Sequence, residues 1–489
     1  MIDPDTAYLA LTARDARFDG RWFVGVTSTQ VYCRPICRVR TPRRENCRFF
    51  ETPAQAEAAA FRPCMKCRPE IAPGNDLAWS VMDASRTLAR QAAAHLDARA
   101  AAGDSPDVAA LAARLGVSER HLRRIFLAEH GVTPLQYIQT RRLLLAKQLL
   151  TDTRLPITQV ALASGFKSVR RFNAAFADNY RMSPSRLRSE PTQRALADDA
   201  AVTMLLAYRA PYDSAALLRF FELRAIPGIE TVTPNGLRRT VRAGVVAPEA
   251  GWIEADFDAQ ASRVSIRFAP QWAMSSARVA AAARRWLDLD ASPQTIDTAL
   301  ANLPGAAGLR LPGSLDGFEL AVRAVLGQQV TVAAARTLAR RLVERFGLQQ
   351  ATPWADIARS FPAPEHLAAA SVASIAELGI IRSRAGAIIA LAQSWPALEA
   401  RLCSREAPEE LIVALRGLPG IGPWTAHYIA MRALSWPDAF PPQDVAVLKA
   451  MRQLFGAEGQ AAAEVQAQAW RPWRAYAVLR LWNSLEKTP

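Results

Sequence analysis

Through much of its first half this chain repeats apolar residues every three or four positions, with polar residues between them. That period is typical of amphipathic helices. The segment Gly103-Asp-Ser-Pro106 ends the first of them. Ser118 follows Gly116, and Ser168 follows Gly165, so each serine is suited to cap the helix that begins after the turn. The predicted helices cover residues 85–101, 107–115, 118–130, about 134–150 and 168–180.

Beyond a polar linker at residues 190–200 the pattern changes to strict alternation. Period two predicts strands, and here a small α+β segment with an antiparallel sheet. An amphipathic helix to about Arg224 interrupts the strands, and an Ala/Arg-rich helix follows them at 275–287. From Pro304 onward we expect helices throughout. The predicted strands cover residues 202–208, 231–232, 236–244, 251–257 and 263–268.

Length and charge narrow the class of protein. A chain of 489 residues has room for three or four domains with cores of their own. The net charge of +15 and the pI near 10.2 favour a polyanionic partner, nucleic acid, over a merely arginine-rich composition. No apolar run approaches the roughly 18 residues of a membrane span, and the N-terminus is acidic and polar. We therefore expect a bacterial cytoplasmic protein associated with the nucleoid, with reduced thiols.

Five of the six cysteines lie between positions 33 and 67, and four of these form two close pairs, Cys33/Cys37 and Cys64/Cys67. Paired thiolates at this spacing, joined by a longer loop, fit a tetrahedral zinc ion. A module this small has little core, so the metal would supply much of its folding free energy. The spacing alone leaves open a purely structural zinc knuckle.

The residues around the cysteines indicate more than a structural site. The segments Val31-Tyr-Cys-Arg-Pro-Ile-Cys37 and Ala60-Phe-Arg-Pro-Cys-Met-Lys-Cys-Arg-Pro-Glu70 closely resemble the N-terminal domain of Ada-type DNA repair regulators. The resemblance implies one zinc ion with four cysteine ligands, the first of which takes a methyl group from a methylated DNA phosphate. The implied ligands are Cys33, Cys37, Cys64 and Cys67, with Cys33 as the methyl acceptor.

Transfer to Cys33 would remove one negative charge beside the DNA, which should strengthen binding to the phosphate backbone. The transfer is expected to be stoichiometric, because nothing in the module could remove the methyl group. Cys47 has no place in the ligand set, and we expect a small buried side chain. The expected basic surround of the site comprises Arg34, Arg38, Arg40, Arg43, Arg44, Arg48, Lys66 and Arg68.

Residues 107–126 and 157–176 share one pattern of helix, glycine-containing turn, serine cap and second helix. This pattern is typical of a helix-turn-helix. Two such units joined by one long helix resemble the AraC-type DNA-binding domain, which implies that the two second helices enter adjacent major grooves. Most single contacts of this kind reach phosphate and not base edges, so the target sequence stays open. The candidate DNA contacts are Glu119, Arg120, Arg123, Arg124, Lys167, Arg170, Arg171 and Asn173.

The stretch from Leu415 to Asp444 carries the main candidate for catalysis. In its tight Leu-Pro-Gly-Ile-Gly turn we expect positive φ at Gly420 and Gly422, together with the close approach of another backbone. Pro423 suits the first turn of the following helix. Such a turn aims backbone N–H groups outward, where they can hold a phosphate. The alternative is a plain helix–helix turn, with the aspartate as a helix cap.

Hairpin, aromatic helix and downstream acid together resemble the helix-hairpin-helix plus Gly/Pro-Asp motif of base-excision DNA glycosylases. The resemblance implies that Gly420 and Gly422 bind DNA and that Asp444 is the catalytic carboxylate. Bifunctional members carry a lysine nucleophile just after the hairpin, where this chain has Trp424. No amine is available there for a Schiff base, so we expect a monofunctional glycosylase that leaves an abasic site.

Residues 199–489 as a whole resemble the AlkA type of 3-methyladenine DNA glycosylase, through segments such as Ala210-Pro-Tyr-Asp213 and Gly308-Leu-Arg-Leu-Pro-Gly313 in matching order. A base inside a duplex must be flipped out before it can be excised. The family's wedge, an apolar side chain that fills the resulting gap, matches Gln329, which departs from that pattern. Aromatic walls suit an electron-poor, often cationic base. The implied pocket residues are Trp424, Tyr428 and Trp482, with Phe318 as a further candidate.

We therefore predict a multidomain, mainly α protein that combines an α+β zinc module, an all-α double helix-turn-helix, an α+β domain with an antiparallel sheet and an all-α glycosylase domain. The predicted function is excision of alkylated bases from double-stranded DNA, joined to phosphotriester sensing and transcription regulation with RNA polymerase as a further partner. The alternative is a regulator whose glycosylase half only binds DNA. The chain has no Pro-Cys-His-Arg motif, so we expect no guanine-O6 repair. The predicted boundaries are 1–80, 85–190, 199–305 and 306–489.

Overall fold

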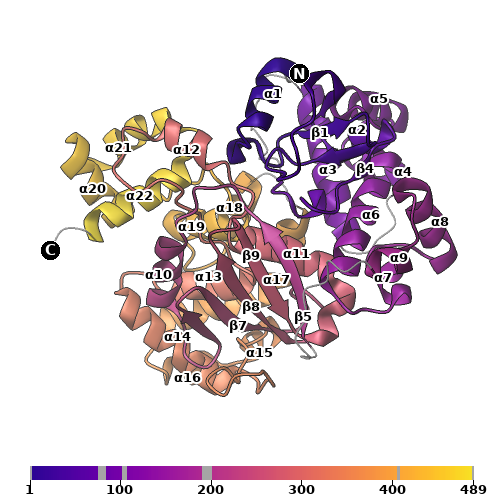
Figure 1. The fold of residues 1–489 in the computed structure, drawn as a ribbon. Coiled ribbons are helices and arrows are strands. Elements are labelled where there is room, and N and C mark those ends of the chain that lie inside the picture. Colours follow the sequence, from indigo (N-terminus) through magenta and orange to yellow (C-terminus); the bar gives the residue numbers. More distant parts are fainter. Residues whose placement is uncertain (1–2, 75–83, 102–106, 190–200, 405–407, 487–489) are drawn as a thin grey trace. The chain divides into compact units, whose positions relative to one another are not determined.

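The computed structural model of the chain describes residues 3–74, 84–101, 107–189, 201–404 and 408–486. The predicted helix-ending segment 103–106 and the polar linker 190–200 lie outside these ranges. The chain forms two compact units, drawn along one colour scale in Figure 1. Unit 1 comprises residues 1–210, 258–281 and 289–291, and unit 2 comprises residues 211–257, 282–288 and 292–489.

Unit 1 begins with a small sheet that carries the cysteine cluster. Its strand order is β3-β1-β2-β4, with β1 antiparallel to β2 and β3, and β2 parallel to β4. Trp22 and Val24 pack against the cysteines in one small core. A second buried cluster, formed by Phe23, Tyr32, Phe50, Ala56 and Phe61, lies in the same module, so its apolar core is larger than the sequence indicated. The elements are α1 (Pro4–Thr12), β1 (Phe23–Val26), β2 (Val31–Cys33), β3 (Cys47–Phe50), α2 (Pro53–Ala58) and β4 (Arg62–Pro63), with 3₁₀ turns at Ala16–Phe18, Arg44–Asn46 and Pro69–Ile71.

The helices of unit 1 confirm the predicted pattern. Ser118 and Ser168 are the N-caps of α5 and α8, and each hydroxyl accepts a backbone N–H three residues on. Thr133 opens the long helix α6 with a capping box. The apolar faces of α3, α4, α5 and α6 share one core. The helices are α3 (Ala84–Ala101), α4 (Val108–Arg114), α5 (Glu119–His130), α6 (Pro134–Asp152), α7 (Ile157–Ala163), α8 (Val169–Tyr180) and α9 (Pro184–Ser189).

Strand β5 (Val202–Ala207) also belongs to unit 1, where it pairs antiparallel with β9 (Arg263–Phe268). Two side chains of α6 bond to the backbone of Leu205. The side chain of Gln148 donates to the carbonyl of Leu205 at 2.9 Å, and the N–H of Leu205 donates to the carboxylate of Asp152 at 3.2 Å. The 3₁₀ turn Pro270–Ser275 follows β9 and leads into α11 (Ser276–Trp286).

The first elements of unit 2 are α10 (Ser214–Arg224) and three consecutive antiparallel strands, β6 (Glu230–Thr233), β7 (Gly236–Val241) and β8 (Gly251–Asp258). The side chains of β7 and β8 alternate only in part between buried and less buried positions. The predicted strands and their antiparallel pairing are confirmed, whereas strict alternation is not.

The remainder of unit 2 is mainly helical, but residues 304–316, 347–363 and 434–444 contain no α-helix. The expectation of helices throughout is therefore wrong for these three segments. Gly347 ends α14, and the prolines in Phe361-Pro-Ala-Pro364 cannot continue a helix. The helices are α12 (Pro293–Ala299), α13 (Gly317–Leu326), α14 (Val332–Phe346), α15 (Pro364–Ala368), α16 (Val372–Ala376), α17 (Arg382–Ser404), α18 (Pro408–Arg416), α19 (Pro423–Ala433), α20 (Val445–Phe455), α21 (Gly459–Ala467) and α22 (Arg474–Glu486), with a 3₁₀ turn at Gln468–Trp470.

Candidate active site and zinc centre

The hairpin between α18 and α19 uses its two glycines differently. Gly420 has φ +77°, and a Cβ there would lie 2.7 Å from the Cβ of Ala387. Gly422 is the N-cap of α19 with φ −82° and ψ 173°, so the predicted positive φ is wrong at this position. No atom lies within 4 Å of where its Cβ would stand. Gly422 therefore leaves open space at the helix N-terminus, whereas Gly420 is required by the turn itself.

One residue that fixes the hairpin was missed by sequence reasoning. The Nε2 of Gln328, just after α13, donates to the carbonyl of Gly420 at 2.9 Å and to Oγ1 of Thr425 at 3.0 Å. Gln328 thus ties the turn after α13 to the hairpin. The neighbouring Gln329, the predicted wedge, is exposed and has φ +52°. The adjacent glutamines have opposite surroundings, and no sequence pattern distinguished them.

The side chain of Asp444 lies beside the first turn of α19, which follows the hairpin, and it bonds to Trp424 there. Only 6% of the Asp444 surface is exposed. It is the N-cap of α20, and Val447 N–H donates to its Oδ1 at 2.9 Å. Two tryptophans also donate to it. Trp424 Nε1 lies 2.8 Å from Oδ2, and Trp482 Nε1 lies 3.2 Å from Oδ1. The helix-cap alternative and a chemical role are therefore both compatible with this carboxylate.

The aromatic residues form a partly buried group beside Asp444. The rings of Trp424 and Tyr428 are stacked, 5.1 Å apart and 11° from parallel, and the Trp482 ring lies 6.4 Å from Tyr428. The structure thus brings together all three predicted pocket residues. Phe318 is not part of this group, because it is fully buried against Phe361 and Trp395 in the core.

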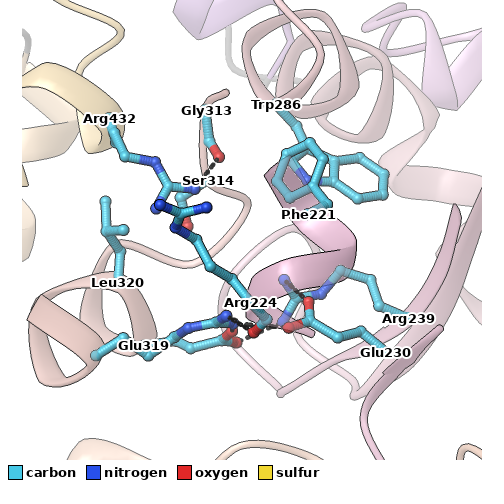
Figure 2. Close-up of a pocket in the computed structure, with 11 residues that line it drawn as sticks. Phe221, Arg224, Glu230, Arg239, Trp286, Gly313, Ser314, Glu319, Leu320 and Arg432 are labelled. Atoms are coloured by element: carbon cyan, nitrogen blue, oxygen red, sulfur yellow. Dashed lines mark hydrogen bonds and ion pairs between the residues drawn. The ribbon is translucent and has the colours of Figure 1, made fainter. Parts of the chain in front are cut away.

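Beside the aromatic group lies a cavity of about 20 Å³, drawn in Figure 2. This volume holds one water molecule and cannot hold a nucleobase. Arg432 reaches it from α19, and Glu230, Glu319 and Arg239 line it on another side. The cavity is therefore a small space between buried charged side chains and not the base pocket.

The Sγ atoms of Cys33, Cys37, Cys64 and Cys67 all lie within 4.8 Å of one another. Sulfurs bound at 2.3 Å to a tetrahedral zinc ion are about 3.8 Å apart, so the cluster fits this metal. The cluster is a Zn²⁺ site with four cysteine ligands. Cys47 is buried outside it, with its thiol directed to the carbonyl of Arg43 at 3.3 Å.

Cys33 is 4% exposed, and Cys67 is the more accessible of these two residues. The backbone N–H of Arg34 donates to Cys67 Sγ at 3.3 Å. A thiolate that accepts such a bond is a weaker nucleophile, because its lone pairs are stabilised. This contact favours Cys33 over Cys67 as the reactive sulfur.

Two members of the predicted basic surround are not available to DNA. The Arg34 side chain is buried in an ion pair with Asp19, and it also donates to the carbonyl of Cys67 at 3.1 Å. Arg68 bridges Glu70 at 3.0 Å and Asp152 at 2.6 Å. Both guanidiniums are internal cross-links, so neither belongs to an exposed basic surround of the zinc site.

The predicted contacts of the helix-turn-helix units lie on the outward faces of α5 and α8, except Lys167, which precedes α8. Leu122 and Phe126 of α5, and Phe172 and Phe176 of α8, point into the core. Arg123 pairs with Glu119 along its own helix, so part of its charge is satisfied internally. None of the helices in the described part of the chain is long and apolar enough to cross a membrane. The exposed candidates are Arg120, Arg123, Arg124, Lys167, Arg170, Arg171 and Asn173, and Glu119 is partly buried.

Four family models match the chain, in the order of the predicted modules. They are the metal binding domain of Ada at residues 6–70, a helix-turn-helix domain at 111–190, the AlkA N-terminal domain at 203–316 and the HhH-GPD superfamily base excision DNA repair protein at 322–475.

Among similar proteins, DNA-3-methyladenine glycosylase 2 of Escherichia coli is 35% identical over 57% of this chain and 95% of its own length. The regulatory protein ada of Salmonella typhimurium is 36% identical over 34% of this chain and 43% of its own length. A Mycobacterium tuberculosis protein named probable bifunctional transcriptional activator/DNA repair enzyme AlkA is 36% identical over 99% of this chain and 97% of its own length. The chain therefore belongs to the family of these bifunctional AlkA proteins.

Proposed function

We propose that this protein excises alkylated bases from double-stranded DNA with Asp444 as its catalytic carboxylate, and that it couples this repair to sensing of methylated phosphates and to control of transcription. The observation that carries the proposal is the carboxylate of Asp444 bonded to the indoles of Trp424 and Trp482 beside the hairpin. The likeness to glycosylase and Ada-type relatives supports both activities. The proposed domains keep the boundaries 1–80, 85–190, 199–305 and 306–489.

The glycosylase step follows from the geometry of these groups. An alkylated base flipped out of the duplex would stack against Trp424 and Tyr428, whose rings attract an electron-poor or cationic base. A carboxylate has about four lone-pair sites, and three N–H donors already bond to Asp444. The remaining site can face the sugar, where positive charge develops as the glycosidic bond breaks. Water then adds to the sugar, and an abasic site remains.

DNA would be held by two features of the hairpin region. The open N-terminus of α19 at Gly422 suits a backbone phosphate, and Gly420 lets the turn form. Gln329 is exposed after α13 and is the proposed wedge. Trp424 replaces the lysine that strand cleavage would need, so a monofunctional enzyme is proposed.

For the sensing half, we propose Cys33 as the methyl acceptor. Zinc held by the four cysteines would keep their sulfurs deprotonated at neutral pH. The Cys33 sulfur attacks the methyl carbon, the carbon–oxygen bond breaks, and the phosphate leaves as an ordinary anionic diester. Arg120, Arg123, Arg124, Arg170, Arg171 and Asn173 are the proposed promoter contacts, and RNA polymerase is the proposed protein partner.

Replacement of Asp444 by Asn tests the glycosylase. The amide keeps the size of the side chain but removes its charge, so release of 3-methyladenine from methylated DNA should fall by at least about 100-fold. Binding to undamaged DNA should change little. Unchanged base release would contradict the assignment. If the natural protein binds DNA normally but releases no alkylated base, the result would instead favour the alternative, a regulator whose glycosylase half only binds DNA.

Mass spectrometry tests the sensor. After exposure to DNA that carries methyl phosphotriesters, the zinc-loaded protein should gain one methyl group, localised to Cys33. Cys33→Ser should gain none. A methyl group on Cys67 or on another cysteine would contradict the proposed acceptor.

A further inference from the structure

The buried Arg432 contacts Tyr428, one of the three residues of the proposed base pocket. It is 7% exposed and lies one helical turn after Tyr428 on α19. Its Nε donates to the carbonyl of Pro312 at 2.8 Å, and its Nη2 to the carbonyl of Gly313 at 3.4 Å, the bond drawn in Figure 2. Its Nη1 donates to the hydroxyl of Tyr428 at 2.8 Å. Two carbonyls and one phenol thus fix the guanidinium.

Within the described ranges Arg432 makes no ion pair. The nearby carboxylates Glu230 and Glu319 are already shared between Arg239 and Arg323, at distances up to 3.1 Å, in a closed group of two acids and two bases. That group is neutral and has no carboxylate to spare. A buried cation without a counter-ion polarises the neutral groups that it contacts, and one of these is the Tyr428 hydroxyl.

The hydroxyl of Tyr428 has one proton and can both accept and donate. Its acceptor side is taken by Arg432, and no described residue accepts its proton. Its ring is stacked on Trp424 within the aromatic group beside Asp444. Because one side of the oxygen is occupied, the proton must point elsewhere, and a bound base is the partner that the proposed function supplies.

We propose that Arg432 is a positioning residue that fixes the Tyr428 hydroxyl as an acceptor on its helix side, so that the hydroxyl donates its proton to an acceptor atom of the flipped base. The ligand class is a base with a ring nitrogen or carbonyl oxygen on the edge that meets Tyr428. This inference rests on the proposed glycosylase and names a further determinant of what it excises.

The electrostatics agree with this geometry. Burial by itself would raise the pKa of Tyr428, but the guanidiniums of Arg432 and Arg224 outweigh it and lower that pKa below its usual range. A hydroxyl made more acidic in this way is a stronger hydrogen-bond donor.

A double-mutant cycle tests the proposal in the full-length protein. Tyr428→Phe removes the hydroxyl and keeps the ring, and it should lower kcat/KM for release of 3-methyladenine about tenfold. Arg432→Met should lower it by a similar factor when Tyr428 is present, and by less than about twofold in the Tyr428→Phe background. Arg432→Lys, which keeps one cationic donor, should restore part of the loss. Arg452→Met, an exposed arginine on α20, is the control for the lost charge.

A second readout separates positioning from simple support of the fold. The phenolate absorbance that is lost in Tyr428→Phe should titrate at higher pH in Arg432→Met than in the natural protein. If Arg432→Met does not fold, Arg432→Lys with and without Tyr428→Phe carries the cycle. Equal losses in both backgrounds, or full activity of Tyr428→Phe, would overturn the proposal. Failure of the glycosylase itself would appear separately, as absence of base release by the natural protein.

Discussion

At the scale of single residues, the orientation of Asp444 is fixed by donors from three helices. One bond comes from its own helix α20, and the others come from Trp424 on α19 and Trp482 on α22. A side chain held in this way has little freedom to follow a moving substrate. Such preorganisation is what electrostatic stabilisation of a transition state requires.

Replacement of Trp424 by Phe tests this arrangement. The ring keeps its stacking position on Tyr428, but the N–H bond to Asp444 Oδ2 is lost, so single-turnover base release should slow about tenfold with little change in DNA affinity. Trp482→Phe removes the longer bond to Oδ1 and should cost less. Equal affinity and unchanged rate in Trp424→Phe would mean that the indole N–H does not orient the acid.

At the scale of elements, the α18–α19 hairpin assigns different tasks to two glycines that look alike in sequence. The turn needs the positive φ of Gly420, and Ala387 of α17 closes the space beside it. Gly422 has an ordinary φ and faces open space. A steric need for glycine at 422 would therefore come from a partner outside the protein.

Alanine at each position separates these tasks. Gly420→Ala should destabilise unit 2 by about 1–3 kcal/mol through backbone strain and contact with Ala387, which would appear as a lower midpoint of thermal unfolding. Gly422→Ala should have the same midpoint of thermal unfolding as the natural protein. Its affinity for DNA, measured by fluorescence anisotropy, should be lower. A Gly422→Ala protein with full DNA affinity would show that no phosphate approaches this nitrogen closely.

The periodicity predicted most elements, because amphipathic helices such as α5 and alternating strands such as β9 bury one face each. Helix caps such as Ser118 could be predicted from the sequence because the capping hydrogen bond joins residues only three positions apart. Contacts between residues far apart in the sequence could not be predicted. Nothing near Arg34 or Arg68 in sequence distinguishes a buried cross-link from a surface charge, and Gln328 is tied to a turn 92 residues away.

At the scale of the molecule, unit 1 joins the zinc module to the helix-turn-helix module through buried polar groups. Glu57 of α2 accepts bonds from Tyr32 of β2 at 3.1 Å and from Thr140 of α6 at 2.9 Å. Burial raises the pKa of Glu57 to about 8. The carboxyl is therefore largely protonated near neutral pH in the folded state and ionised when unfolded.

This shift gives unit 1 a pH-dependent stability. The folded pKa of Glu57 lies above the unfolded value near 4.5, so its contribution is fully present below about pH 4.5 and is lost as pH rises toward 8. Each pH unit in that window removes at most about 1.4 kcal/mol. Calorimetry at about pH 5 and about pH 8 should show this loss in the natural protein and a smaller one in Glu57→Gln. Identical pH profiles for both proteins would contradict the role of Glu57.

Around Glu57 lies a second set of contacts, in which Lys147 of α6 pairs with Glu70 at 2.6 Å and Arg68 pairs with Asp152 at 2.6 Å, all four side chains largely enclosed. Replacing one member of either pair with a neutral side chain would leave its partner enclosed without a counter-charge, which costs several kcal/mol. The sensor is thus not an interchangeable cassette. A chimera that borrows residues 1–74 from a relative must import the matching face of α6 as well, so the two modules are constrained to change together.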